Sequence, residues 1–155
     1  MSNSELKQRL HDDMTAALKA RDDIRKSTLR MALTAVTKAE VAGKEARELS
    51  DAEVLDVLTS EAKKRRESVV AYREAGRAEL ADKEQAEADI LAEYLPEQLT
   101  ADEIAALVTE TIAATGAAEL GPRGIGKVMG ALQPKVKGKA DGGAVSAEVK
   151  RQLGA

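Results

Sequence analysis

Apolar side chains recur at steps of three and four residues along most of the chain, the spacing of one face of an α-helix. The clearest rows are Leu6, Leu10, Met14 and Leu18, then Ile24, Thr28, Met31 and Ala35, then Leu55, Leu58, Ala62, Arg65, Val69 and Tyr72. No stretch alternates apolar and polar residues as a half-buried strand does. The pattern therefore predicts an all-α protein.

Three segments have the form of a capping box, in which a Ser or Thr and a Glu three residues later satisfy the free amides of a helix start. They are Ser2-x-x-Glu5, Ser50-x-x-Glu53 and Thr100-x-x-Glu103. A further helix is expected to begin at Asp22 or Asp23 and to stop at Gly43. The helix behind Ser50 is expected to reach about Ala75, which makes it about 38 Å long and its domain elongated.

The next two helices also have marked ends. Pro96 disfavours a helical conformation at Leu95, so the helix that starts near Ala78 is expected to stop there. The helix that follows Thr100 is expected to close at Gly116, because glycine readily adopts the left-handed conformation of a helix C-terminus.

Glycine marks the end of the chain, since eight of the 11 glycines follow residue 120. Two short helices are expected there, one from residue 122 or 123 to about 132 and one from about 142 to 153. Pro134 and Gly138 are expected in the loop between them, because proline interrupts a helix and glycine favours a turn.

Composition adds to this picture of an elongated N-terminal helical domain, residues 1–95, and a small C-terminal tail-like helical domain, residues 96–155. The chain has no Phe and no Trp, and Tyr72 and Tyr94 are its only aromatic residues, so its cores must be aliphatic. It has no cysteine, which excludes disulfides and thiolate metal sites. The first residues lack a signal-peptide pattern and no apolar run is long enough to span a bilayer, so a cytoplasmic location is expected.

The formal net charge of −3 is unevenly distributed along the sequence. Residues 1–120 carry 17 Lys and Arg against 25 Asp and Glu, a net of −8, whereas residues 121–155 carry seven against two, a net of +5. A basic end on an acidic body is typical of a protein that contacts a polyanion with that end. The cations of this end are Arg123, Lys127, Lys135, Lys137, Lys139, Lys150 and Arg151.

Catalytic chemistry has little support in the sequence. His11 is the only histidine and is followed by Asp12 and Asp13 on a predicted amphipathic helix, where a solvated role is favoured over a metal or catalytic one. Gly121 to Lys127 has the spacing of a phosphate-binding loop, but Val128 stands where magnesium needs a hydroxyl ligand. We therefore expect no catalytic residue, no metal and no cofactor.

Two basic segments are the remaining candidates for binding. Residues 63–66, Lys-Lys-Arg-Arg, spread around a helix, which favours a solvated face over a nucleic-acid contact. Arg65 is the exception, because it falls in an apolar row and needs a carboxylate partner or a route to solvent. The lysines of residues 135–139 stand before the last predicted helix, whose free amides would complete an anion site; a flexible linker is an equal alternative. Without an aromatic residue, this part of the chain is expected to contact the phosphates of structured RNA and not to stack on bases.

A set of ordered motifs covers nearly the whole chain. They are Leu29-Arg30-Met31, Lys63-Lys64-Arg65-Arg66-Glu67-Ser68, Tyr72-Arg73-Glu74-Ala75-Gly76-Arg77, Tyr94-Leu95-Pro96-Glu97-Gln98-Leu99, Gly126-Lys127-Val128-Met129-Gly130 and Lys137-Gly138-Lys139-Ala140-Asp141-Gly142. With this set the chain resembles the YqeY-like proteins of the GatB/YqeY family. The resemblance implies that the C-terminal part is similar to the tail of the GatB protein, a component of the glutamine-dependent aspartyl/glutamyl-tRNA amidotransferase. That tail helps to hold tRNA, while the amidation chemistry lies in a separate cradle domain.

The resemblance also implies roles for single residues. It points to Lys127, Lys137, Lys139 and Arg123 as tRNA-facing, and to Gly126, Gly130 and Gly138 as backbone and packing positions. The cradle and the glutaminase of the enzyme have no counterpart in this sequence, so the family's label of carbon–nitrogen ligase with glutamine as amido donor is not supported by residues here. We expect a non-catalytic tRNA-binding or accessory factor, whose helical body orients the RNA or binds a protein. The alternatives are a helical protein-interaction adaptor without RNA binding, and a component of a glutamine-dependent carbon–nitrogen ligase system.

Overall fold

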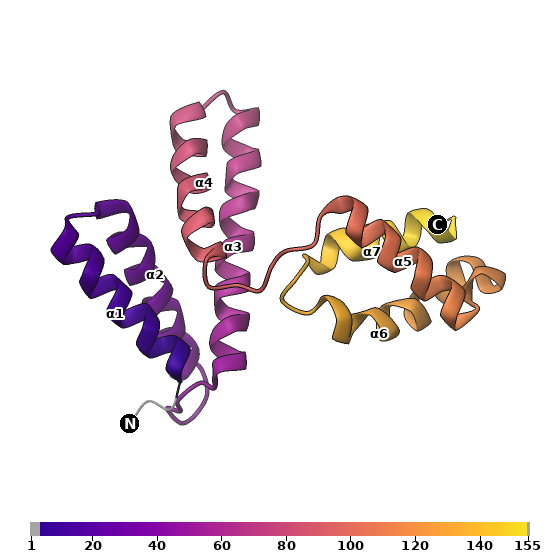
Figure 1. Ribbon diagram of the computed structural model, residues 1–155, viewed down its shortest axis with the longest axis horizontal. Coiled ribbons are helices and arrows are strands. Elements are labelled where there is room, and N and C mark those ends of the chain that lie inside the picture. The colour runs from indigo at the N-terminus through magenta and orange to yellow at the C-terminus, as the bar shows by residue number, and fades with distance from the viewer. Residues whose placement is uncertain (1–3, 155) are drawn as a thin grey trace. The chain divides into compact units, whose positions relative to one another are not determined.

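The computed structural model of the chain describes residues 4–154 and contains helices and loops, with no strand among those residues (Figure 1). Its elements are α1 (Glu5–Ala20), α2 (Asp23–Glu40), α3 (Asp51–Glu74), α4 (Ala78–Ala92), α5 (Ala101–Thr115), the 3₁₀ helix η1 (Ala117–Gly124), α6 (Ile125–Val136) and α7 (Gly142–Leu153). The prediction of an all-α fold is confirmed. The chain divides into two compact units, residues 1–95 and 96–155. That these units are two separate domains stays a prediction.

Two helical hairpins make up the N-terminal unit, α1 with α2 and α3 with α4 (Figure 1). Its core is aliphatic apart from one tyrosine, as the composition requires. The buried members are Leu10, Leu29, Ala32, Val36, Leu49, Val54, Leu58, Ala62, Ile90, Leu91 and Tyr94. Two contacts hold Tyr94 in place. Its hydroxyl donates to Asp13, and the Arg9 guanidinium lies over its ring, 4.5 Å from the centroid.

The predicted helix starts are largely observed. Ser50 and Thr100 each form the expected capping box, and Asp22 caps α2. The box assigned to Ser2 lies outside the described residues. The observed cap of α1 is Ser4, whose side chain accepts from the Lys7 amide at 3.0 Å.

The Ser4 cap also connects two helix starts. Its hydroxyl donates to Oδ1 of Asp51 at 2.6 Å, and the same oxygen accepts from the Leu6 amide at 3.2 Å. The Ser4 hydroxyl thereby lowers the pKa of Asp51. Side-chain capping therefore joins the start of α1 to the start of α3.

The end of α2 differs from the prediction. The helix stops at Glu40 and not at Gly43. Glu40 is buried, and its carboxylate accepts from Lys7 Nζ at 2.8 Å and from the Leu49 amide at 3.3 Å. Its backbone carbonyl accepts from the Arg47 amide at 2.9 Å. These bonds stabilise a loop conformation that ends the helix early, and the Lys7 contact lowers the pKa of Glu40.

The C-terminal unit packs α5, η1, α6 and α7 around a second aliphatic core. Its buried members are Ile104, Val108, Ile112, Ala117, Val128, Leu132, Val136, Val145, Val149 and Leu153. The expectation of a loop at Pro134 is wrong, because α6 continues through it to Val136. Proline has no amide hydrogen, so α6 lacks one helix hydrogen bond at Pro134. Burial of Val136 in the core and the hydrogen bond from the Lys137 amide to the Gln133 carbonyl, at 3.1 Å, offset this loss.

None of the helices between residues 4 and 154 is, by itself, both long enough and apolar enough to cross a bilayer. The helix α5 and the segment Ala117–Val136 meet that length and hydropathy only as a pair, which is bent by 112°.

Candidate functional site

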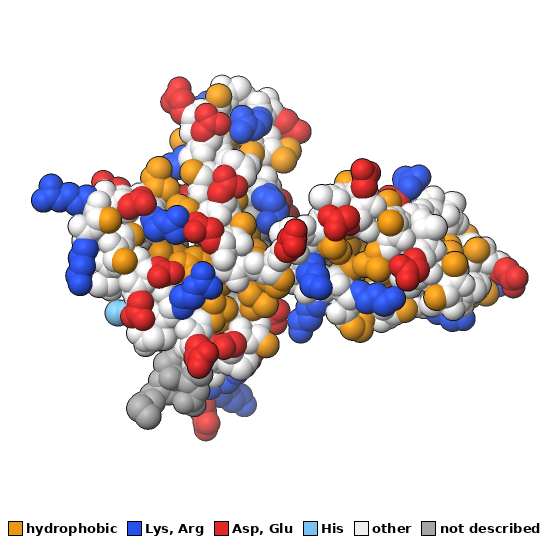
Figure 2. Space-filling view, in the orientation of Figure 1, with side chains coloured by type: hydrophobic (Ala, Val, Ile, Leu, Met, Phe, Trp, Pro, Cys, Tyr) orange, Lys and Arg blue, Asp and Glu red, His pale blue; other side chains and the backbone are white. Residues whose placement is uncertain are grey.

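All seven cations predicted to contact RNA are exposed on the C-terminal unit. They are Arg123 on η1, Lys127 and Lys135 on α6, Lys137 and Lys139 between α6 and α7, and Lys150 and Arg151 on α7. Figure 2 shows Lys and Arg side chains spaced among apolar and acidic ones on the visible face, with no single dense patch. All seven cations are therefore accessible to a ligand.

One of the seven is neutralised by a neighbour. Arg151 pairs with Glu148 one turn earlier on α7, with Nε 2.9 Å from Oε2. The guanidinium lowers the pKa of Glu148 to about 2. The other six cations make no ion pair with any residue from 4 to 154. Their charge remains available to a ligand.

The lysine loop, defined here as residues 137–141, is a tight turn at the end of α6. Gly138 has a φ of +75°, so its predicted backbone role is confirmed. The carbonyl of Val136 accepts from the amides of Lys139 at 2.8 Å and Ala140 at 3.1 Å. This bonding is that of a defined turn and argues against a flexible linker.

Residues 96–99 brace the lysine loop from outside it. Gln98 Nε2 donates to the carbonyls of Pro96 at 2.7 Å and Gly138 at 2.8 Å, and the Leu99 amide donates to the Lys139 carbonyl at 2.8 Å. Two motifs far apart in the sequence thus meet. Sequence reasoning missed Gln98 as a positioning residue, although it stands in the Tyr-Leu-Pro-x-Gln-Leu motif that could have indicated it.

The start of α7, predicted to complete an anion site, holds a carboxylate of the chain itself. Asp141 is the N-cap residue but makes no capping hydrogen bond from its side chain. A Cβ added at Gly143 would lie 3.2 Å from its Oδ2, so the carboxylate lies against the first turn. A phosphate at this helix start would have to displace or avoid it, which leaves the lysine side chains as the better anion ligands.

The C-terminal unit as a whole carries no net charge. Residues 96–155 have seven Lys and Arg against seven Asp and Glu, whereas residues 1–95 have 17 against 20, a net of −3. The change from net negative to net positive charge near residue 120 therefore occurs within this unit. The chain from residue 96 to the end of α5 holds four acids and no cation, namely Glu97, Asp102, Glu103 and Glu110. The positive charge of this unit therefore lies on α6, α7 and the turn between them, and its negative charge on α5 and the segment before it.

The glycines around the Gly-Lys-Val-Met-Gly motif are of two kinds. Gly124 packs closely, because a Cβ there would lie 2.9 Å from the Ala117 carbonyl oxygen. Gly126 and Gly130 have nothing within 4 Å of such a Cβ, so their predicted role as packing positions is wrong. Each destabilises α6 by roughly 0.5–1 kcal/mol relative to alanine. The fold itself gives no reason for this bare, exposed strip of backbone.

The catalytic candidates remain surface or structural features. His11 is exposed, and Asp13 accepts the Tyr94 hydroxyl. No cluster of three or more potential metal ligands occurs between residues 4 and 154. The segment from Gly121 to Lys127 lies in η1 and the first turn of α6, and Ala117 fills the space beside Gly124.

Arg65 finds the carboxylate that its place in an apolar row requires. It is only 5% exposed, and its Nε lies 3.5 Å from Oε2 of Glu87 on α4. Its Nη1 donates to the Glu61 carbonyl at 3.0 Å. Burial raises the pKa of Glu87, with a smaller contribution from Glu84, and Arg65 opposes this rise. The basic run of residues 63–66 therefore includes a buried structural cation.

Comparison with known proteins gives one family. The family model described as Yqey-like protein matches residues 7–153, which includes both units. No curated protein matches the chain.

Proposed function

Because the chain belongs to the YqeY-like protein family, we propose that it is a non-catalytic accessory factor that binds folded tRNA through η1, α6, the lysine loop and α7. One observation carries the proposal: six exposed cations in this stretch lack an ion-pair partner among the described residues. The choice of tRNA rests on the resemblance of the Gly-Lys-Val-Met-Gly and lysine-loop motifs to the tail of the amidotransferase protein GatB.

The mode of binding follows from what the C-terminal unit offers. Residues 96–155 include no aromatic side chain, so bases cannot be bound by stacking and the ligand is the sugar–phosphate backbone. Gly126 and Gly130 leave part of α6 bare beside Lys127, which lets that backbone approach the helix closely. The turn braced by Gln98 holds the positions of Lys137 and Lys139. These features support recognition of shape and charge.

Salt dependence of binding tests the proposal. Affinity of the full chain for a tRNA transcript is measured by fluorescence anisotropy from 50 to about 250 mM salt. Six phosphate contacts predict a log–log slope of about −5, and Lys137→Ala with Lys139→Ala should flatten it by about 2. The matched control is Lys19→Ala with Lys44→Ala, which removes the same charge from the N-terminal unit. Salt-independent affinity, or equal slopes for the two double variants, would sink the proposal.

The absence of catalysis is tested separately. The purified chain is mixed with mischarged glutamyl-tRNA, glutamine and ATP, and the charged amino acid is analysed. We expect no amidation, since the sequence has no counterpart of the amidotransferase cradle or glutaminase. ATP-dependent formation of glutaminyl-tRNA would instead support the carbon–nitrogen ligase alternative.

A second candidate function, a protein-interaction adaptor, is favoured by a different observation. An open groove of about 530 Å³ lies between residues 31–38 of α2 and 56–64 of α3, within the N-terminal unit. We call it the α2–α3 groove. If this function is the sole one, tRNA affinity is absent while partner binding persists in the Lys137→Ala, Lys139→Ala variant.

A further inference from the structure

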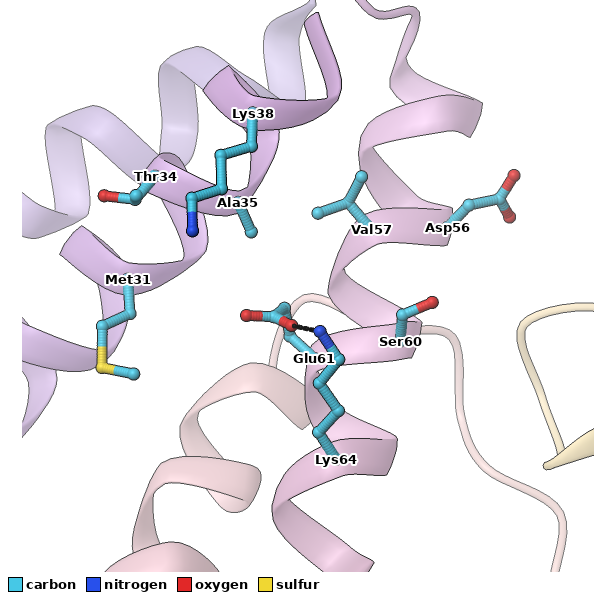
Figure 3. Close-up of a pocket in the computed structure, with 9 residues that line it drawn as sticks. All are labelled: Met31, Thr34, Ala35, Lys38, Asp56, Val57, Ser60, Glu61 and Lys64. Atoms are coloured by element: carbon cyan, nitrogen blue, oxygen red, sulfur yellow. Dashed lines mark ion pairs between the residues drawn. The ribbon is translucent and has the colours of Figure 1, made fainter. Parts of the chain in front are cut away.

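The α2–α3 groove has an apolar floor. Figure 3 shows Ala35 of α2 and Val57 of α3 facing each other across it, with Met31 one turn before Ala35. Met31 is 47% exposed. A second hollow of about 330 Å³ shares Thr34 and Lys38 with the groove and extends over α2 to Met14 of α1.

The two apolar rows of α2 are covered to different extents. Leu29, Ala32 and Val36 are buried in the core. In the other row Thr28 is buried and Ala35 is half-buried, but Ile24 and Met31 remain 46% and 47% exposed, so this row is only partly covered. An apolar row that the fold leaves open, with polar residues at its border, is typical of a protein-interaction surface.

Beside this floor lies Arg65, whose Nη1 is satisfied by the Glu61 carbonyl and lies 3.7 Å from Glu61 Oε1, whereas its other two nitrogens are poorly satisfied. Arg65 Nη2 has only the Sδ of Met31 as a partner, at 3.8 Å, and thioether sulfur is a weak acceptor. Its Nε is buried without a hydrogen bond, since the Glu87 oxygen at 3.5 Å lies outside hydrogen-bond geometry. A carboxylate that replaced the Met31 sulfur would form a far stronger, charge-assisted bond.

The charges at the border of the groove favour an acidic ligand. Lys38 of the groove and Arg30 of the adjoining hollow make no ion pair with any residue from 4 to 154. Figure 3 shows the Asp56 carboxylate pointing away from α2. The remaining acid, Glu61, is paired with Lys64 at 3.1 Å. With Asp56 directed away, the charge that faces the floor without a partner is that of Lys38, and Arg30 adds a second cation in the adjoining hollow.

We propose that the α2–α3 groove binds an acidic amphipathic helix of a partner protein. Its apolar residues cover Ala35 and Val57, and one of its carboxylates displaces the Met31 sulfur from Arg65. Helices docked in grooves bind in this way, through apolar anchors at positions i, i+3 or i+4, and i+7. The binding is independent of the RNA contact, because it uses the N-terminal unit alone.

Selection from a peptide library tests the groove without knowledge of the partner. A phage-displayed library of random helix-favouring peptides is selected against the full chain and sequenced. Enriched peptides should have apolar residues at i, i+3 or i+4, and i+7, and a net negative charge. No enrichment, or enrichment of basic or uncharged helices, overturns the proposal.

Two matched substitutions then locate the binding. Met31→Glu places a carboxylate beside Arg65 and should weaken a selected peptide at least about tenfold. Val70→Glu makes the same change at an apolar residue that is 57% exposed on α3 outside the groove, and should leave affinity unchanged. Equal effects of the two substitutions overturn the proposal.

Two further measurements keep the test decisive if Met31→Glu folds poorly. Lys38→Glu changes an exposed side chain, so it should fold normally and weaken the acidic peptide several-fold, with recovery when one peptide Glu is changed to Lys. Retained affinity in Lys38→Glu contradicts the charge argument. Sedimentation of the wild-type chain completes the set, because a dimer that Met31→Glu dissociates would make a second copy the occupant and overturn the proposal.

Discussion

In the N-terminal unit, charged side chains join helices to one another, whereas most cations of the C-terminal unit face solvent. Ion pairs link elements in Lys7–Glu40, Arg25–Glu93, Arg65–Glu87 and Arg73–Asp82. In the C-terminal unit, the one cation paired with a described residue is Arg151, and its partner lies on the same helix. The comparison teaches that the number of charges does not indicate a binding surface; what matters is whether the fold already uses them.

The largest expected effect comes from removing a charge that the N-terminal unit uses for its own structure. Arg65→Ala leaves Glu87 buried without its counter-charge and should reduce the free energy of unfolding by roughly 3 kcal/mol. The replacement of both residues, Arg65→Met with Glu87→Leu, should recover most of the loss. Urea denaturation followed by circular dichroism measures both. The neighbouring Arg66→Ala is the control and should change stability by less than about 0.5 kcal/mol. A similar loss in both single variants would contradict the structural role of Arg65.

Glycine substitutions sharpen the C-terminal side of the comparison. Gly124→Ala places a methyl group 2.9 Å from the Ala117 carbonyl oxygen. It should destabilise the protein by roughly 1–3 kcal/mol. Gly126→Ala and Gly130→Ala should each stabilise it by roughly 0.5–1 kcal/mol. Thermal unfolding measures these changes.

The same alanines separate stability from binding. If RNA approaches the bare part of α6, Gly126→Ala and Gly130→Ala weaken tRNA binding although they stabilise the fold. Stabilised variants with unchanged affinity would show that the RNA does not contact this part of the helix.

A smaller effect is expected for Gln98→Ala, which removes a brace but no charge. Loss of the bonds to Pro96 and Gly138 should reduce stability by about 1 kcal/mol. It should also weaken tRNA binding a few-fold while the salt slope stays constant, because the number of cations is unchanged. The control is Gln133→Ala, an exposed residue of α6. A changed salt slope would contradict this role, because it would mean that Gln98→Ala alters the number of phosphate contacts made by the cations.

The smallest effect is on pH dependence, and it has the same sign for one glutamate of each unit, Glu53 and Glu148. The pKa of Glu53 is lowered to about 2 by Arg47, and that of Glu148 to about 2 by Arg151. A lowered carboxyl pKa gives stability that is present above the unfolded value of 4.5 and is lost as pH falls towards 2. Glu53→Gln and Glu148→Gln should each flatten the fall of melting temperature below pH 4.5.

Glu87 has a raised pKa, so Glu87→Gln should instead reduce a loss of stability as pH rises.

Much of the fold could be predicted because it depends on neighbours in the chain. The boxes at Ser50 and Thr100 use side chains three residues apart, and the cap at Gly116 needs only a left-handed glycine. The prediction was wrong where distant contacts compete with local preference. Glu40 ends α2 because Lys7 and Leu49 bind its carboxylate. The helix α6 passes Pro134 because Val136 is drawn into a core.

The sequence supplied the residues of the candidate site but did not predict how they are arranged. All seven cations could be read from the sequence, but their separation into one paired and six unpaired members required the positions of the acids. Gln98 was missed because its partner, the Gly138 carbonyl, is 40 residues away in the chain. The half-exposed Met31 was missed because spacing alone cannot distinguish a covered apolar row from an open one.

The sequence by itself determined the helices, the aliphatic character of both cores and the supply of cations near the end of the chain. Each of these depends on residue type and on interactions within a few positions. Only the tertiary structure decided which charges are used. It set the basic end against the acidic α5 in one neutral unit, buried Arg65 against Glu87, and left Ile24 and Met31 of the second row of α2 half exposed. The physical reason is that burial and ion pairing depend on distances between segments that local preference does not fix.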